Sequence, residues 1–137
     1  MGSFHRRGGY SIFIPEIDAE HRTLFRLADE LATALDAHKR LAHSELLQSL
    51  TTHIQHHFAH EERLMRASAY SALVWHKQQH DGSRRQVKRF VKRIEQGDRE
   101  AGAELLQYLG GWLENHVLVT DRMMAAHLRN FERRRAA

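Results

Sequence analysis

The 137-residue chain contains no cysteine, and this absence restricts the metal chemistry open to it. Without thiols there are no disulfides, thiolate metal sites or iron–sulfur clusters, so any metal must bind nitrogen and oxygen ligands. A reducing compartment fits the same absence. No apolar run approaches the ~20 residues needed to span a bilayer, and the first ten residues lack the apolar segment of a signal peptide. We therefore expect a cytoplasmic protein with no membrane span.

Proline is nearly absent as well, since Pro15 is the only one in the chain. The remaining composition, 42% hydrophobic and rich in Ala, Leu, Glu, Arg and Gln, is typical of a helical globular protein. The length suits one domain. We predict a single domain over residues 1–137, divided into an arm (1–17), a helical bundle (18–131) and a basic tail (132–137).

Positive charge exceeds negative charge, giving a formal net charge of +4. Much of the positive charge lies in residues 84–93 and in the C-terminal segment from Arg129 to Arg135. A solvated helix face explains the first run and a frayed terminus explains the second. We therefore expect neither nucleic-acid nor membrane binding, and the sequence names no protein partner.

Apolar residues recur at spacings of three and four in four segments, which is typical of amphipathic helices. The expected helices run from an N-cap at Asp18 to about His38, from a cap at Ser44 through Leu64, from Ser71 to Gln96, and from Arg99 to Phe131. Gly97-Asp98 is expected to end the third helix. Short connections between four such helices predict an all-α fold, an up-down-up-down antiparallel four-helix bundle with an extended N-terminal arm.

The composition is unusual in its twelve histidines. Several of them lie on the apolar stripes of the expected helices. A buried imidazole or carboxylate without a partner costs about 1–3 kcal/mol, and more when charged. A shared metal ion removes this cost, and neutral imidazole with carboxylate suits iron, manganese or zinc. Six polar residues on the stripes need such a partner, and Asp121 lies near the stripe of the fourth segment: the six are His21, His57, Glu61, His76, His80 and His116.

A rival register of the second helix would use His56 and His60 as ligands. The apolar stripe at positions 54, 57, 61 and 64 favours His57 and turns His53, His56 and His60 toward its flanks or solvent. Glu-x-x-His pairs of the ferritin type do not occur, and neither does His-Glu-x-x-His. The pattern therefore does not favour an iron store, a carboxylate-rich oxidase or a zincin.

Four segments resemble the hemerythrin family, and specifically bacterial hemerythrin domains: IPEIDAEH, HFAHEERLM, HKQQH and WLENHVLVTD. The resemblance covers nearly the whole chain. It implies that His76, His80 and His116 hold one iron and that His21 and His57 hold the other. It further implies that Glu61 and Asp121 bridge the two irons beside a hydroxide or oxide, which leaves an open position on the two-histidine iron.

The function that the resemblance implies is reversible O₂ binding at a non-haem di-iron centre, for oxygen storage, transport or delivery. Two alternatives stay open. One is O₂ or redox sensing through a separate partner protein, and the other is peroxide or nitric oxide turnover at the same irons. In the leading interpretation the protein is not an enzyme.

Further expectations concern single positions. His116 and Asp121 are five residues apart, which turns the acid about 140° away on a regular helix, so we predict a π-bulge there. Asp18 is either a helix cap or an acceptor for an imidazole N–H. Phe13 replaces the small residue usual in related domains and is expected to narrow a ligand path. Surface positions are expected for His5, His38 and His127, and core positions for Met65, Trp75, Trp112, Met123 and Met124.

Overall fold

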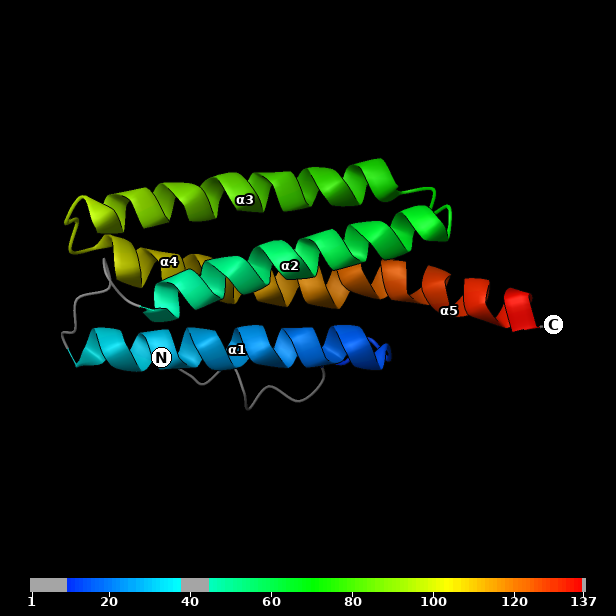
Figure 1. Cartoon of the computed structure of the whole chain (residues 1–137), viewed down its shortest axis with the longest axis horizontal. Helices are drawn as coiled ribbons and strands as arrows, with labels where there is room; N and C mark the ends of the chain where they lie inside the picture. Colours follow the sequence, from blue (N-terminus) through cyan, green and yellow to red (C-terminus); the bar gives the residue numbers. More distant parts are fainter. Residues whose placement is uncertain (1–9, 38–44, 137) are drawn as a thin grey trace.

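The computed structural model describes residues 10–37 and 45–136, and every regular element in these ranges is helical. The elements are α1 (Pro15–Asp36), α2 (Glu45–Ala67), α3 (Leu73–Glu95), α4 (Ala101–Trp112), the π-helical segment η2 (Leu113–Asp121) and α5 (Arg122–Ala136). Figure 1 shows that α4, η2 and α5 form one continuous rod. The rods alternate in direction along the chain, so the predicted antiparallel four-helix bundle is confirmed.

The first helix begins at Pro15, which is earlier than the predicted start at Asp18. Proline suits the first helical position because its φ is already helical and its missing N–H needs no partner there. Asp18 is therefore not the cap, and no histidine in the described part of the chain donates to it. Its carboxylate accepts hydrogen bonds from the Ile12 N–H (2.9 Å) and the Ser11 hydroxyl (2.8 Å), so it holds the segment before α1 in place.

The third helix ends as predicted at the Gly-Asp pair. Gly97 has φ +86°, a left-handed conformation that side chains disfavour, and its N–H donates to the Ile94 carbonyl at 3.0 Å. The Asp98 N–H closes the turn on the Arg93 carbonyl at 3.0 Å. Ser44, the predicted cap of the second helix, lies outside the described residues.

The predicted π-bulge between His116 and Asp121 is confirmed as the longer segment η2. Hydrogen bonds from residue i to i+5 place residues five apart on one face, so both side chains point inward and are at most 3% exposed. Helix α5 then continues past the predicted end at Phe131 to Ala136, so the described part of the basic tail is helical.

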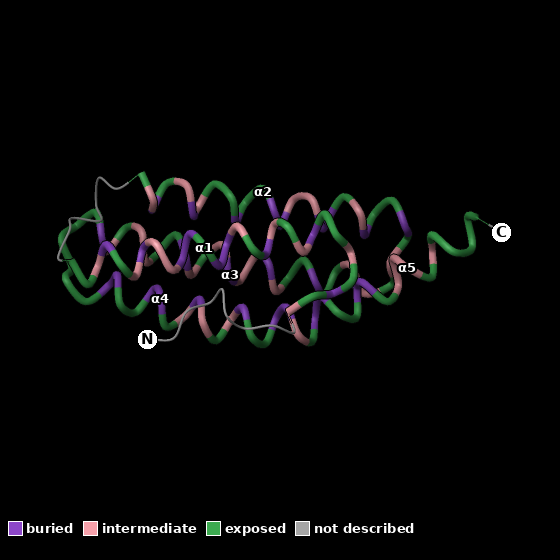
Figure 2. Tube along the Cα trace, turned by 90° about the horizontal axis from the view of Figure 1, so that it is seen from below, coloured by how far each residue is buried: buried purple, intermediate pink, exposed green. Residues whose placement is uncertain are grey.

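Buried residues recur along all four rods (Figure 2), and the apolar ones form one core cluster. Ile12 from the segment before α1 joins this core at 1% exposure, and the Arg129 guanidinium donates to its carbonyl at 2.6 Å. Met65 and Met124 are fully buried as predicted. The core prediction is wrong for Trp75 and Met123, which are 42% and 50% exposed.

Over the described ranges, no helix combines the length and apolar character needed to cross a membrane.

Candidate metal centre

All seven residues expected to bind metal meet at one buried point, and each is at most 3% exposed. Their donor atoms form two groups, each with all atoms within 4.8 Å of one another. One group contains Glu61, His76, His80, His116 and Asp121, and the other contains His21, His57, Glu61 and Asp121. The two carboxylates belong to both groups, so the cluster has a three-histidine end and a two-histidine end.

Glu61 turns one oxygen toward each end of the cluster. Its Oε1 lies 3.3 Å from His76 Nε2 and 3.1 Å from His80 Nε2, whereas its Oε2 lies 3.3 Å from His57 Nε2. A carboxylate in this orientation can bridge two cations.

The two carboxylate oxygens of Asp121 also face different ends of the cluster. Its Oδ1 lies 3.1 Å from His76 Nε2 and 3.0 Å from His116 Nε2, and its Oδ2 lies 3.2 Å from His21 Nε2. The π-helical turn of η2 makes this possible, because it carries Asp121 back to the face occupied by His116.

Many polar atoms at the centre of the cluster are buried without a hydrogen bond. Among the described residues they include both oxygens of Glu61 and Asp121 and the Nε2 atoms of His76, His80 and His116. Each unsatisfied group costs about 1–3 kcal/mol, so such a concentration requires a common partner. Lone pairs of imidazole and carboxylate that converge on one point are the donor set of divalent iron, and the cluster fits a di-iron site.

Outer hydrogen bonds hold the ligand imidazoles in one orientation. His57 Nδ1–H donates to Glu20 Oε1 at 2.7 Å, and His80 Nδ1–H donates to Glu62 Oε2 at 2.8 Å. A carboxylate only accepts, so in both rings Nδ1 carries a proton and Nε2 is the nitrogen that faces the cluster and can bind a metal. Arg84 in turn contacts Glu62 at 2.9 Å.

His116 has an amide rather than a carboxylate as its outer partner. Its Nδ1–H donates to Gln79 Oε1 at 3.0 Å, and the Thr120 hydroxyl donates to the same oxygen at 2.9 Å. Sequence reasoning did not identify Glu20, Glu62 or Gln79. Their sequence signal is a position directly beside a cluster residue. This signal is weak, because adjacent residues on a helix point about 100° apart.

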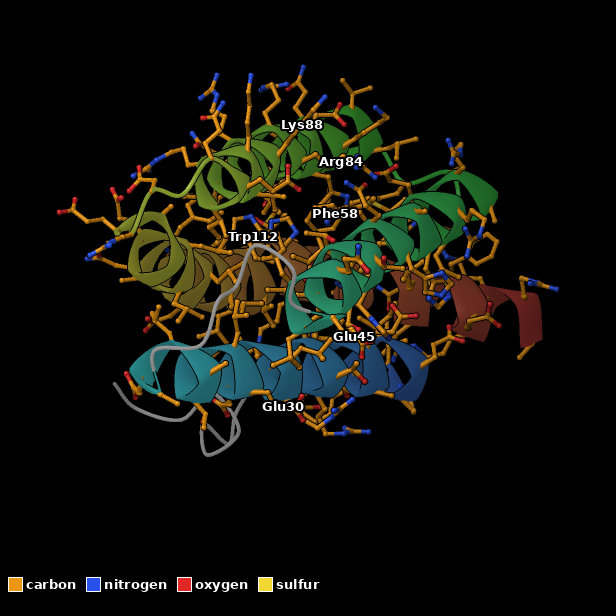
Figure 3. All side chains as sticks on the ribbon, turned by 60° about the vertical axis from the view of Figure 1, so that its left-hand side comes forward. Glu30, Glu45, Phe58, Arg84, Lys88 and Trp112 are labelled. Carbon is orange, nitrogen blue, oxygen red and sulfur yellow. The ribbon has the colours of Figure 1, made fainter. Side chains whose placement is uncertain are left out.

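Aromatic rings pack against the three-histidine end. Phe58 stacks on His80 with ring centroids 4.1 Å apart, and Trp112 stacks on His116 at 4.5 Å. Figure 3 shows Phe58 and Trp112 inside the ring of helices. Trp112 was expected to be a plain core residue, but it contacts a candidate ligand. At the two-histidine end the nearest aromatic contact of His21, apart from His57, is the tilted ring of Phe25 at 6.4 Å.

Electrostatics keep both central carboxylates charged. Burial and the neighbouring Glu61 raise the pKa of Asp121, but His116 and His21 outweigh them and bring it below its ordinary value. Burial lowers the pKa of His57, but Glu61 and Glu20 outweigh it and raise the pKa to about 10. A cation that takes the place of this proton is therefore favoured by the same negative charge.

Within the described ranges, the histidines outside the seven lie away from the cluster. His53 and His56 are exposed, and His60 is half-buried and bonded to Glu20. His127 was expected at the surface but is half-buried, with its Nε2 3.0 Å from the Ser68 carbonyl oxygen. His5, His38 and His43 lie outside the described residues.

Phe13 lies on the outer surface, 73% exposed, with its ring 5.8 Å from the Arg129 guanidinium carbon. It lines a surface groove with Leu64, Leu128 and Arg133, and no residue of the cluster lines that groove. The expected narrowing of a path to the cluster therefore has no support in this placement.

A four-helix bundle with histidines from every rod and two shared carboxylates at its centre has the architecture of a protein with a two-metal site. Residues 13–128 match the model of the hemerythrin HHE cation binding domain, and the chain belongs to the hemerythrin family.

Individual relatives agree with this assignment. The chain is 31% identical to a bacteriohemerythrin of Stenotrophomonas maltophilia over 127 residues, covering 90% of this chain and 82% of the relative. It is 28% identical to a bacteriohemerythrin of Clostridium acetobutylicum, covering 82% of this chain and 92% of that protein. A myohemerythrin of Theromyzon tessulatum is 29% identical, with 82% of each chain covered.

Proposed function

We propose that the chain holds two iron ions and binds O₂ reversibly, for oxygen storage, transport or delivery. The proposed ligands are the seven residues of the cluster. The observation that carries this proposal is the division of the Glu61 and Asp121 oxygens between a three-histidine and a two-histidine end. Two ferrous ions at these ends would supply the electrons that reversible oxygen binding needs.

The two ends offer different numbers of protein donors. Five residues converge at the three-histidine end and four at the two-histidine end. The end with fewer donors leaves more room for an external ligand, and there we place O₂ binding. The names bacteriohemerythrin and myohemerythrin borne by the relatives support the same assignment.

The residues around the cluster have two further tasks. Glu20, Glu62 and Gln79 keep the Nδ1 protons away from the metal side, so three of the imidazoles are oriented before a metal arrives. Ile54, Phe58, Leu113 and Val117 lie within three residues of a proposed ligand in sequence and are at most 3% exposed. Such apolar packing excludes water, which favours reversible binding over loss of electrons to solvent.

The test is to load the protein with ferrous iron without oxygen, count the metal, and record visible spectra through cycles of air and deoxygenation. We expect two irons per chain and a colour that appears and disappears with oxygen. His53→Ala is the matched control, because His53 is exposed on α2 and outside the cluster. A different stoichiometry, or a colour that never reverses, would exclude an oxygen carrier.

A further inference from the structure

Glu20 on α1 supports two histidines of α2, one inside the bundle and one near its surface. Its Oε1 accepts from His57 Nδ1 at 2.7 Å, and its Oε2 accepts from His60 Nδ1 at 2.6 Å. The His57 side chain is 1% exposed and belongs to the cluster, whereas the His60 side chain is 18% exposed and does not. One carboxylate therefore orients an inner and an outer imidazole.

The hydrogen bond prepares His60 for metal binding in the same way as it prepares His57. Because Nδ1–H donates to the carboxylate, Nε2 is the ring nitrogen that keeps its lone pair. Histidines that ligate metals almost always have such a partner on the other nitrogen. Carboxylates support His57 and His80 in the cluster, and His60 has the same support with no role there.

His56 lies one helical turn before His60 and is exposed. Side chains four residues apart on a helix are neighbours, with about 5–6 Å between their Cβ atoms. Two imidazoles at this spacing are a recurrent chelating pair for zinc, as in helices that carry His-Glu-x-x-His. The pair needs only water to complete the coordination of an ion at the surface.

We propose that His56 and His60 form a second, exterior site for a divalent transition-metal ion such as Zn²⁺, with His60 oriented by Glu20. The site requires neither iron nor oxygen in the buried cluster, so it extends beyond the proposed oxygen-binding function. Imidazole nitrogen suits zinc, nickel and copper, and zinc is the simplest probe because it has no redox chemistry.

The experiment titrates zinc chloride into the iron-loaded protein by calorimetry and compares His56→Ala, His60→Ala and His53→Ala. We expect one zinc-binding event per chain that disappears in the first two variants and persists in the third. His53 is the matched control because it is exposed on the same helix and its Nδ1 contacts the Ser49 carbonyl oxygen at 2.8 Å. Iron content is measured on every sample and is expected to stay constant.

Three results would overturn the proposal: unchanged zinc binding in His60→Ala, loss of the event in His53→Ala, or release of iron in step with zinc uptake. The comparison between the unaltered chain and His60→Ala is informative whatever metal fills the buried cluster. Failure of the oxygen-binding proposal is therefore distinguishable from failure of this one.

Discussion

The two ends of the buried cluster are built differently. The three-histidine end draws its imidazoles from α3 and η2 and is packed by the stacked rings of Phe58 and Trp112. The two-histidine end draws them from α1 and α2, and its outer carboxylate, Glu20, is 21% exposed. The two ends therefore differ in their surroundings: aromatic rings cover the three-histidine end, whereas the outer carboxylate of the two-histidine end reaches the surface.

The largest effect is expected from Glu61→Ala, because Glu61 is the one residue of α2 whose oxygens face both ends. Its removal takes a charged donor from each proposed ion, so the metal content should fall from two ions to less than one per chain. Elemental analysis of purified, iron-loaded protein measures this. Glu45→Ala, an exposed substitution at the start of α2, should keep both ions. Retention of two ions by Glu61→Ala would contradict the bridging role.

His57→Ala should weaken metal binding at the two-histidine end of the cluster only. The three-histidine end keeps all of its donors in this variant, so we expect one iron per chain and loss of reversible oxygen binding. Metal analysis and the visible spectrum report the two effects. Two irons bound at full affinity would mean that the register of ligands on α2 is wrong, and His53→Ala provides the baseline.

Glu20 and Glu62, which hold ligand imidazoles from outside the cluster, should affect metal binding at opposite ends of it. Loss of an outer partner typically weakens metal binding about 10–100-fold. In the His57→Ala background, where one ion remains, Glu62→Gln should produce this loss because Glu62 holds His80. Glu20→Gln should leave that ion unchanged. Competition with a chelator measures the affinity, and equal effects of the two substitutions would remove the distinction between the ends.

The smallest effect concerns packing at the three-histidine end. Trp112→Leu removes the ring stacked on His116 and should lower the free energy of unfolding by about 0.5–1.5 kcal/mol beyond the area lost. Chemical denaturation measures this difference. Trp75→Leu is the matched control, since Trp75 is 42% exposed and a surface change is usually within about 0.5 kcal/mol. Equal losses in both variants would show that the stacking adds no stability.

Helical periodicity was sufficient to predict the bundle and to predict that His57, rather than His56 or His60, is buried, because a side chain's place on an apolar stripe follows from spacing alone. The five-residue spacing of His116 and Asp121 was sufficient to predict the π-helical turn. Periodicity failed for Trp75, which was expected in the core but is 42% exposed.

The amino-acid sequence by itself determined the helices, the absence of thiol ligands and the inward placement of five histidines and Glu61, because each depends on residue type and local spacing. Only the tertiary structure decided which oxygen of Glu61 and Asp121 faces which end of the cluster, and which outer partner each imidazole has. These depend on the rotation and height of one helix against another. Packing of the whole core sets both, and no local pattern encodes them.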